Sequence, residues 1–189
     1  TDTSTSDYVL DSIVSLYNEW CDLTDSDQDK DELYETAEKV LEDKSFSALD
    51  INTLVSRELD ELNDSYFLSA AVNEMDDEEI EFQEIDIGMT LGYRNRNNIV
   101  LHNSEGHLVG DCMKDGKIII KDDLTHPLAR EMEGGEIIVE GDVLENSSIG
   151  NHMKGGKITL KGDFNGFVMG RNMEGGEIYI EGDINGNFY

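Results

Sequence analysis

The sequence is poor in cysteine, proline and basic residues, and each shortage excludes a class of protein. Its 189 residues include two cysteines, Cys21 and Cys112. Two thiols are too few for a disulfide framework or a four-thiolate metal site, which predicts a protein of a reducing cytoplasm. The single proline and the hydrophobic content of 38% argue against a disordered chain.

Positive charge is scarce, because 14 Lys and Arg stand against 43 Asp and Glu, a formal net charge of −29. Such a surface repels phosphate backbones and anionic lipid, so we expect neither nucleic acid nor membrane among the partners. No hydrophobic run approaches the ~20 residues of a membrane span. The acids are typical of a cytoplasmic protein of a halophilic organism, where concentrated salt screens carboxylate repulsion.

Glycine is absent from the first 77 residues, and all 18 glycines come after Met75. This change in composition predicts an acidic helical domain over residues 1–77 and a second domain over residues 78–189. In the first domain, apolar residues recur at helical spacing. Four helices are predicted, at 7–20, 27–43, 48–62 and about 64–74.

Helix starts and faces are also predicted. Ser6 or Asp7 can cap the first helix and Asp50 the third, because their side chains can accept hydrogen bonds from free backbone N–H groups. Leu49 is expected on the buried face of the third helix. The helical domain is expected to cover the start of the second domain, near Ile80.

The second domain is a repeat of about 20 residues. The segments 113–122, 132–142, 153–163 and 173–183 align without gaps, and each begins with methionine. Met113, Met132, Met153 and Met173 are 19, 21 and 20 residues apart, and a constant period of this size predicts a solenoid. Earlier apolar pairs at the same spacing raise the expected number of rungs to about six.

Each rung is predicted to hold two short strands separated by corners. In the longer strand alternate residues face inward, as Ile118 and Ile120 do. A second short segment precedes each methionine, as Val109-Gly110 does, and the methionines are expected in the core. The glycines that form the corners are Gly134, Gly135, Gly141, Gly155, Gly156, Gly162, Gly175, Gly176 and Gly182. The expected fold is therefore α+β, with N-terminal helices and then a right-handed parallel β-helix.

Charge alternates from rung to rung at three positions of the repeat. The columns read Lys114, Glu133, Lys154, Glu174; Lys117, Glu136, Lys157, Glu177; and Lys121, Glu140, Lys161, Glu181. Stacked strands lie about 4.8 Å apart, where opposite charges attract by roughly 0.2–1 kcal/mol per pair and like charges repel. The alternation predicts stacking in this register and disfavours a slip by one rung.

These Met-x-Gly-Gly-x-Ile-x-Ile-x-Gly-Asp units resemble the repeats of the GXGXG-type β-helix family. That family includes the C-terminal domain of the glutamate synthase large subunit and one of the subunits of formylmethanofuran dehydrogenase. The resemblance covers about residues 78–189 and implies a scaffold within a larger oxidoreductase, whose chemistry belongs to other domains or subunits. Asp115, Asp122 and Ala129 stand where the pattern has glycine.

Metal sites are only weakly indicated. His107 and His126 are expected on adjacent rungs, and Cys112, Glu131 and His152 share a second column. Zinc requires four ligands in a tetrahedron, whereas these residues lie in straight columns, so surface residues are the preferred interpretation. The corner aspartates Asp122, Asp142, Asp163 and Asp183 are expected to bond the N–H groups of their own corners, with a calcium stack as the alternative.

Catalysis is not indicated by any spacing. The paired glycines lie between two strands rather than between a strand and a helix, so they do not form a dinucleotide fingerprint. No nucleophile and base have a catalytic spacing. We therefore expect no catalytic residue, no cofactor and no metal.

The sequence favours a non-catalytic scaffold or protein-interaction subunit. A subunit that contributes to a redox site of an oxidoreductase complex is the first alternative, and a polysaccharide-acting β-helix protein is the second. The last rung leaves an open sheet edge, which predicts a homodimer through that end or through an outward strip of Ile119, Ile138 and Tyr179. In the alternative, Ile184, Phe188 and Tyr189 fold over the end as a plug.

Overall fold

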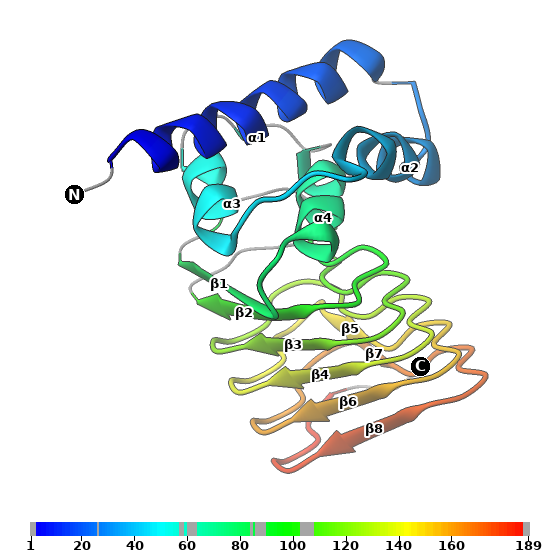
Figure 1. The fold of residues 1–189 in the computed structure, drawn as a ribbon. Helices are drawn as coiled ribbons and strands as arrows, with labels where there is room; N and C mark the ends of the chain where they lie inside the picture. The colour runs from blue at the N-terminus through cyan, green and yellow to red at the C-terminus, as the bar shows by residue number, and fades with distance from the viewer. Residues whose placement is uncertain are drawn as a thin grey trace.

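A computed structural model of the chain describes residues 3–25, 27–56, 59, 64–83, 85, 90–102 and 108–186, with the backbone alone for 3–12. Four helices precede a parallel β-solenoid, which confirms the predicted α+β class. In Figure 1 the helices gather at one end of the molecule and the strands stack away from them. Among the described residues, no helix is long and apolar enough to cross a membrane.

Three of the four helices lie close to the predicted segments, whereas the third, predicted to reach residue 62, ends at Val55 with Ser56 as its C-cap. The four helices are α1 (Thr3–Leu23), α2 (Lys30–Leu41), α3 (Ala48–Val55) and α4 (Asp64–Glu74). Because α1 already begins at Thr3, Ser6 and Asp7 lie inside it, and the expectation that either one caps this helix is wrong.

The starts of α2 and α3 are fixed by side-chain caps. The Asp29 carboxylate accepts hydrogen bonds of 3.0 Å from two backbone N–H groups in the first turn of α2. Ser47 caps α3, and the Asp50 carboxylate accepts the Ser47 backbone N–H at 2.8 Å in return. Asp50 is therefore the second partner of a capping box and not the cap that the sequence predicted.

The inward face of α3 also differs from the prediction. Ile51 and Leu54 are fully buried, whereas Leu49 is 70% exposed. A helix turns about 100° per residue, so a helix that buries Ile51 and Leu54 directs Leu49 to the opposite side. The expectation that Leu49 is buried was wrong for this reason.

The strands of the solenoid form two parallel sheets. The larger contains β1 (Glu79–Gln83), β2 (Asn98–His102), β3 (Lys117–Ile120), β4 (Glu136–Val139), β6 (Lys157–Leu160) and β8 (Glu177–Ile180), in that order. The smaller pairs β5 (Ser148–Ile149) with β7 (Val168–Met169). The described part of the large sheet thus has six strands, one for each predicted rung.

The register of the large sheet follows the repeat residue for residue. One row runs from Ile80 through Ile99, Ile118, Ile137 and Ile158 to Ile178. The second predicted row also forms, because Val109, Leu128, Ile149 and Met169 pair in sequence. The stacking that the sequence predicted is confirmed on both faces.

A third row was not predicted. Leu124, Val143, Phe164 and Ile184 pair in parallel from rung to rung. Its signal was present in the sequence, since each of these residues comes directly after an aspartate, which for Leu124 is Asp123 rather than the expected corner residue Asp122. The chain between the third row and the second varies in length, at residues 124–128, 143–149 and 164–169. The unequal repeat lengths therefore arise at this one corner.

The methionines explain the second glycine of each Met-x-Gly-Gly unit. Met113, Met132 and Met153 are fully buried, as predicted, and Met173 of the last rung is half-buried. A Cβ placed on Gly135 would lie 2.6 Å from the Met113 methyl carbon. A Cβ on Gly156 would lie 2.7 Å from the Met132 methyl carbon, and one on Gly176 would lie 2.6 Å from that of Met153. Each of these three buried methionines thus fills the space that the next rung leaves without a side chain.

The helices and the solenoid share one core. A single cluster of buried residues extends from Ile13 in α1 to Phe164 in the fifth of the six rungs. The Asn97 amide beside β2 donates to the carbonyls of Val72 and Asp77, at 3.1 and 3.0 Å. Asn52 of α3 donates to the Glu81 carbonyl of β1 at 3.1 Å. The helices therefore cover the first rung, as expected.

Replacing Gly135 should strongly destabilise the solenoid. This residue has φ +79°, and an added Cβ would also lie 2.8 Å from the Asp115 backbone. Left-handed geometry and overpacking together predict that Gly135→Ala costs about 2–4 kcal/mol of unfolding free energy. Gly170→Ala is the matched control, because Gly170 has φ +61° but no neighbour closer than 3.4 Å; it should cost about 1 kcal/mol. Denaturant unfolding measures both, and equal losses would contradict this account of the methionine contact.

Candidate functional site

The three charge columns form ion pairs between neighbouring rungs. A carboxylate oxygen of Glu136 lies 3.2 Å from Lys117 Nζ on one side, and its second oxygen lies 3.5 Å from Lys157 Nζ on the other. The same geometry, at 2.6–3.4 Å, recurs at Lys114–Glu133–Lys154 and Lys121–Glu140–Lys161. The alternating charges therefore form ion pairs between neighbouring rungs in all three columns, as the sequence predicted.

The lysines stabilise the charged form of these glutamates. Hydrogen bonds from lysines of neighbouring rungs hold the pKa values of Glu133, Glu136 and Glu140 below the ordinary value. The side chains remain about one-third exposed, so each pair contributes little on its own. Their main effect is to favour the observed register of the rungs over a slip by one rung.

The last rung differs from the others. Glu174, Glu177 and Glu181 occupy the same three columns and are exposed, and within the described residues no lysine lies within 4.0 Å of their carboxylates. The lysines of the rung before them pair instead with the glutamates on their other side. Glu177 accepts a hydrogen bond of 3.2 Å from the Tyr179 hydroxyl of its own strand. The last described rung thus presents three carboxylates in a fixed spacing.

The corner aspartates connect rungs, which corrects the prediction that each one bonds its own corner. The Asp142 backbone N–H donates to Asp123 Oδ1 at 2.8 Å, Asp163 to Asp142 at 2.7 Å and Asp183 to Asp163 at 2.8 Å. Stacking brings the N–H of the next corner to the carboxylate, and the described ladder begins at Asp123 rather than at Asp122. A Cβ on Gly162 would lie 2.3 Å from Asp142 Oδ1, so the glycine leaves room for this carboxylate.

The weak metal candidates do not converge. Cys112, Glu131 and His152 share one column, as predicted, and all three have left-handed backbone angles, with φ of 55°, 58° and 57°. His126 Nδ1 lies 2.8 Å from the Thr125 hydroxyl, and His107 lies outside the described residues. In the part of the chain that the structure describes, no three His, Cys, Asp or Glu side chains form a group that could hold a metal ion.

A polar cluster joins α2 to the solenoid. Lys30 Nζ lies 3.3 Å from Asp111 Oδ2, 3.6 Å from Cys112 Sγ and 5.2 Å from the centre of the Tyr93 ring. The Asp111 side chain is only 2% exposed, and burial raises the pKa of its carboxyl group. Lys30 and Asp111 are 81 residues apart, and no local pattern in the sequence indicates their contact.

The same cluster includes Asp31, the residue that follows Lys30 in α2. The Asp31 carboxylate accepts hydrogen bonds from the Tyr93 hydroxyl and from Arg94. Burial raises the pKa of the Cys112 thiol, which is the opposite of what an activated nucleophile requires. The cluster therefore attaches α2 to the solenoid.

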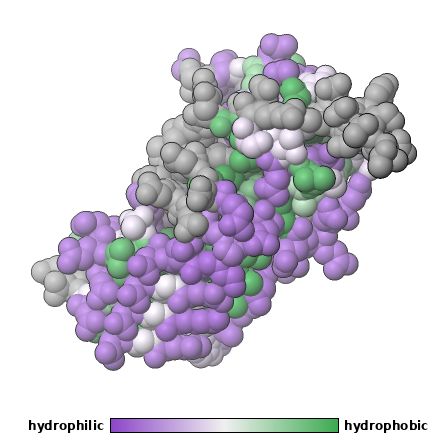
Figure 2. All heavy atoms as spheres, turned by 90° about the vertical axis from the view of Figure 1, so that its left-hand side faces the viewer, coloured by the Kyte–Doolittle hydropathy of each residue, from purple (hydrophilic) through white to green (hydrophobic). Residues whose placement is uncertain are grey.

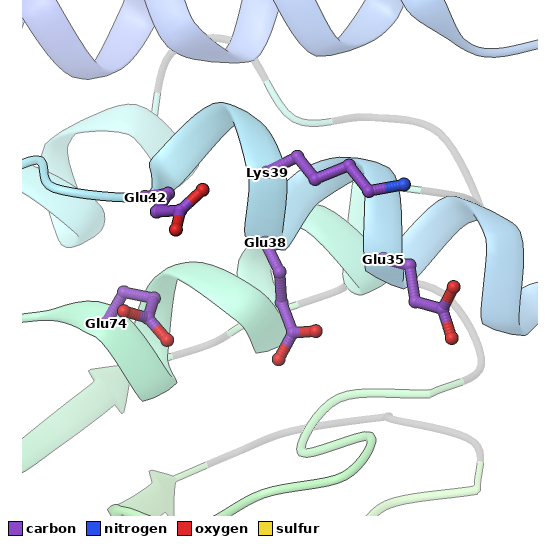
Figure 3. A pocket seen from close by; sticks show the side chains of 5 residues that line it. All are labelled: Glu35, Glu38, Lys39, Glu42 and Glu74. Carbon is purple, nitrogen blue, oxygen red and sulfur yellow. The ribbon is translucent and has the colours of Figure 1, made fainter.

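An acidic groove lies between α2 and α4. It has a volume of about 540 Å³ and is lined by Glu35, Glu38, Lys39, Glu42 and Glu74. Figure 3 shows that the carboxylates spread along the groove instead of pointing to one centre. Arg94 and Arg96 lie 3.5 and 3.7 Å from Glu35 and Glu38. The described lining of the groove thus consists of four carboxylates and one lysine.

The apolar positions of the last rung are uncovered. Ile158 and Leu160 of β6 are fully buried, whereas the equivalent Ile178 and Ile180 of β8 are half-buried. Ile184, which stacks on Phe164, is 51% exposed. Phe188 and Tyr189 of the predicted plug lie outside the described residues. Within the described chain, β8 is the open edge of the large sheet.

One side of the solenoid is mostly hydrophilic. Figure 2 shows the side of the solenoid at which the strands of the large sheet end, and hydrophilic residues dominate it. The uncovered last rung is thus the candidate interaction site of a helix-capped parallel β-solenoid. The chain matches no protein-family model, and neither a curated protein nor a solved structure matches it.

Reversing one charge should destabilise the stack, and reversing its whole column should restore it. Lys157→Glu places three acids in succession, at positions 136, 157 and 177, and should cost about 1 kcal/mol of unfolding free energy, less in molar salt. The fourfold variant Lys117→Glu, Glu136→Lys, Lys157→Glu, Glu177→Lys keeps the net charge and regains alternation. Denaturant unfolding should return close to the wild-type value. A fourfold variant as unstable as the single one would contradict pairing between rungs.

Acid should remove the contribution of the inner glutamates. Their lowered pKa values mean that this stabilisation is complete above the ordinary carboxyl pKa of about 4.3 and is lost as the pH falls through the lowered values. The variant Glu133→Gln, Glu136→Gln, Glu140→Gln should therefore differ most from wild type near neutral pH and converge with it in acid.

The matched control changes the same charge on the last rung. Glu174→Gln, Glu177→Gln, Glu181→Gln removes carboxylates that have no lysine within 4.0 Å among the described residues. Because this control keeps the inner glutamates, its thermal unfolding should follow the wild-type pH profile from pH 7 to about pH 3, including the loss of stability in acid that the inner variant lacks. Equal pH profiles for the two triple variants would show that the lysines do not lower the pKa values of the inner glutamates.

Proposed function

We propose that the protein is a non-catalytic scaffold that binds another protein chain at the open end of its solenoid. One observation carries this proposal, namely the uncovered last rung. Ile178 and Ile180 are half-buried and Ile184 is exposed, at positions that the preceding rung buries fully. An apolar face beside an unpaired strand edge gains free energy when another chain covers it.

The polar clusters support a structural role for the rest of the molecule. Asp111 pairs with Lys30, and Asp31 with Tyr93 and Arg94, across the junction between α2 and the solenoid. The raised pKa of Cys112 does not favour a thiolate at neutral pH. These groups hold the helices on the first rungs and leave the opposite end as the binding surface.

The repeat indicates the larger setting of the scaffold. Its resemblance to the β-helix of glutamate synthase and formylmethanofuran dehydrogenase supports assembly with an oxidoreductase, in which other subunits perform the chemistry. A salt-rich cytoplasm, predicted from the net charge of −29, is part of the same proposal.

Co-purification from the native host tests the proposal. The variant Ile180→Lys, Ile184→Lys adds charge to the open end, and Ile119→Lys adds one to the outward strip of the large sheet as the control. A partner should co-purify with wild type and with the Ile119 variant and be lost from the double variant. Circular dichroism checks that each variant folds. Partners that remain bound to the double variant would overturn the proposal.

A further inference from the structure

We propose that the partner supplies an extended strand that pairs in parallel with β8 and places three basic side chains against Glu174, Glu177 and Glu181. The inference rests on the proposed function and states the chemistry of its partner. It is carried by the coincidence, at the open end, of backbone acceptors, acidic side chains and uncovered apolar groups.

The backbone of the last rung repeats an arrangement that each earlier rung uses. The Gly135 carbonyl accepts the Lys157 N–H at 2.9 Å, and the Gly156 carbonyl accepts the Glu177 N–H at 3.0 Å. The next carbonyl in this row belongs to Gly176. Because β8 is the last strand of the described sheet, this carbonyl is directed away from the stack and can accept an N–H from an incoming strand.

In the other two charge columns, too, a carbonyl of one rung accepts the backbone N–H of the charged residue in the next rung. The Met153 carbonyl accepts the Glu174 N–H at 2.8 Å, and the Leu160 carbonyl accepts the Glu181 N–H at 2.9 Å. In all three columns the residue that donates its backbone N–H also carries the charged side chain. The equivalent acceptors for an incoming strand are the carbonyls of Met173, Gly176 and Ile180.

This coincidence fixes the spacing of the partner. Its strand must donate N–H groups at positions i, i+3 and i+7, and the side chains at those positions meet the three glutamates of the last rung. Basic residues are required there, because the inner glutamates pair with lysines at the same three positions. Apolar residues at i+4 and i+6 would cover Ile178 and Ile180.

A second copy of the chain does not meet these requirements. Two-fold pairing of β8 with itself is antiparallel, and an axis at Tyr179 brings Glu177 of one copy opposite Glu181 of the other, where like charges repel. A head-to-tail contact would need an open first rung, which the helices cover through Asn52 and Asn97. Each copy also carries a net charge of −29. The geometry therefore points to a different, basic strand.

Two peptides copied from the chain provide matched probes. The peptide with the sequence of residues 153–163 has lysines at the required spacing, whereas that of residues 132–142 has glutamates at the same positions. A scrambled form of the lysine peptide controls for general attraction to an acidic surface. Fluorescence anisotropy with the full chain should show binding of the lysine peptide about tenfold tighter than the scrambled form, and no binding of the glutamate peptide.

Reversing the charges of the last rung should reverse the preference. The variant Glu174→Lys, Glu177→Lys, Glu181→Lys should bind the glutamate peptide and lose the lysine peptide. Equal binding of the scrambled peptide, or an unchanged preference in the reversed variant, would overturn the inference. So would a sedimenting dimer of the wild-type chain that Ile184→Lys dissociates, because a second copy would then occupy the open end.

The two proposals fail in different ways. A native partner that is lost from the Ile180→Lys, Ile184→Lys variant but retained by the charge-reversed variant would preserve the scaffold and exclude the basic strand. A partner that is lost from both variants supports the inference. A partner retained by the apolar double variant excludes the open end as its binding site, whatever the peptides do.

Discussion

Parallel stacking at the spacing of hydrogen-bonded strands is the constraint on which this structure depends. At about 4.8 Å between rungs, each side chain meets the residue one repeat away. Lys117 faces Glu136, the Met113 methyl group occupies the space above Gly135, and the Asp142 carboxylate receives the Asp163 N–H. Ion pairs, core contacts and corner hydrogen bonds therefore all specify the same register, so a slip by one rung would break them together.

The same constraint leaves the two ends of the stack unlike. At the first rung, the backbone edge and the apolar face are covered by α3, α4 and the segment before β2, through Asn52 and Asn97. At the last rung, the described chain repeats the acceptors, charges and apolar positions of the inner rungs with nothing paired to β8. The asymmetry between the ends gives the proposed scaffold a direction, with a joint at one end and a binding surface at the other.

The sequence predicted most of the features that repeat, although not the row of Leu124 and Val143, and missed those that occur once. The alternation of Ile118 and Ile120 with outward residues, and the charge columns, recur along the stack, so the strands, register and ion pairs could be predicted. The pairing of Lys30 with Asp111 occurs once, across 81 residues, and has no periodic signal. Asp142 was assigned the right corner and the wrong partner, because a single repeat does not show whether a carboxylate bonds its own rung or the next. Leu49 was misplaced because the face of a short helix depends on the residue at which it starts.

One corner of the solenoid absorbs all the variation in repeat length, between the row of Leu124 and the row of Val109. Segments 124–128, 143–149 and 164–169 differ in length, yet the large sheet keeps its register past each of them. Chain can therefore be gained or lost along this ridge without disturbing the ladders, as surface loops generally tolerate. During evolution, insertions at this corner could therefore produce new binding loops, because the large sheet keeps its register whatever the length of the corner.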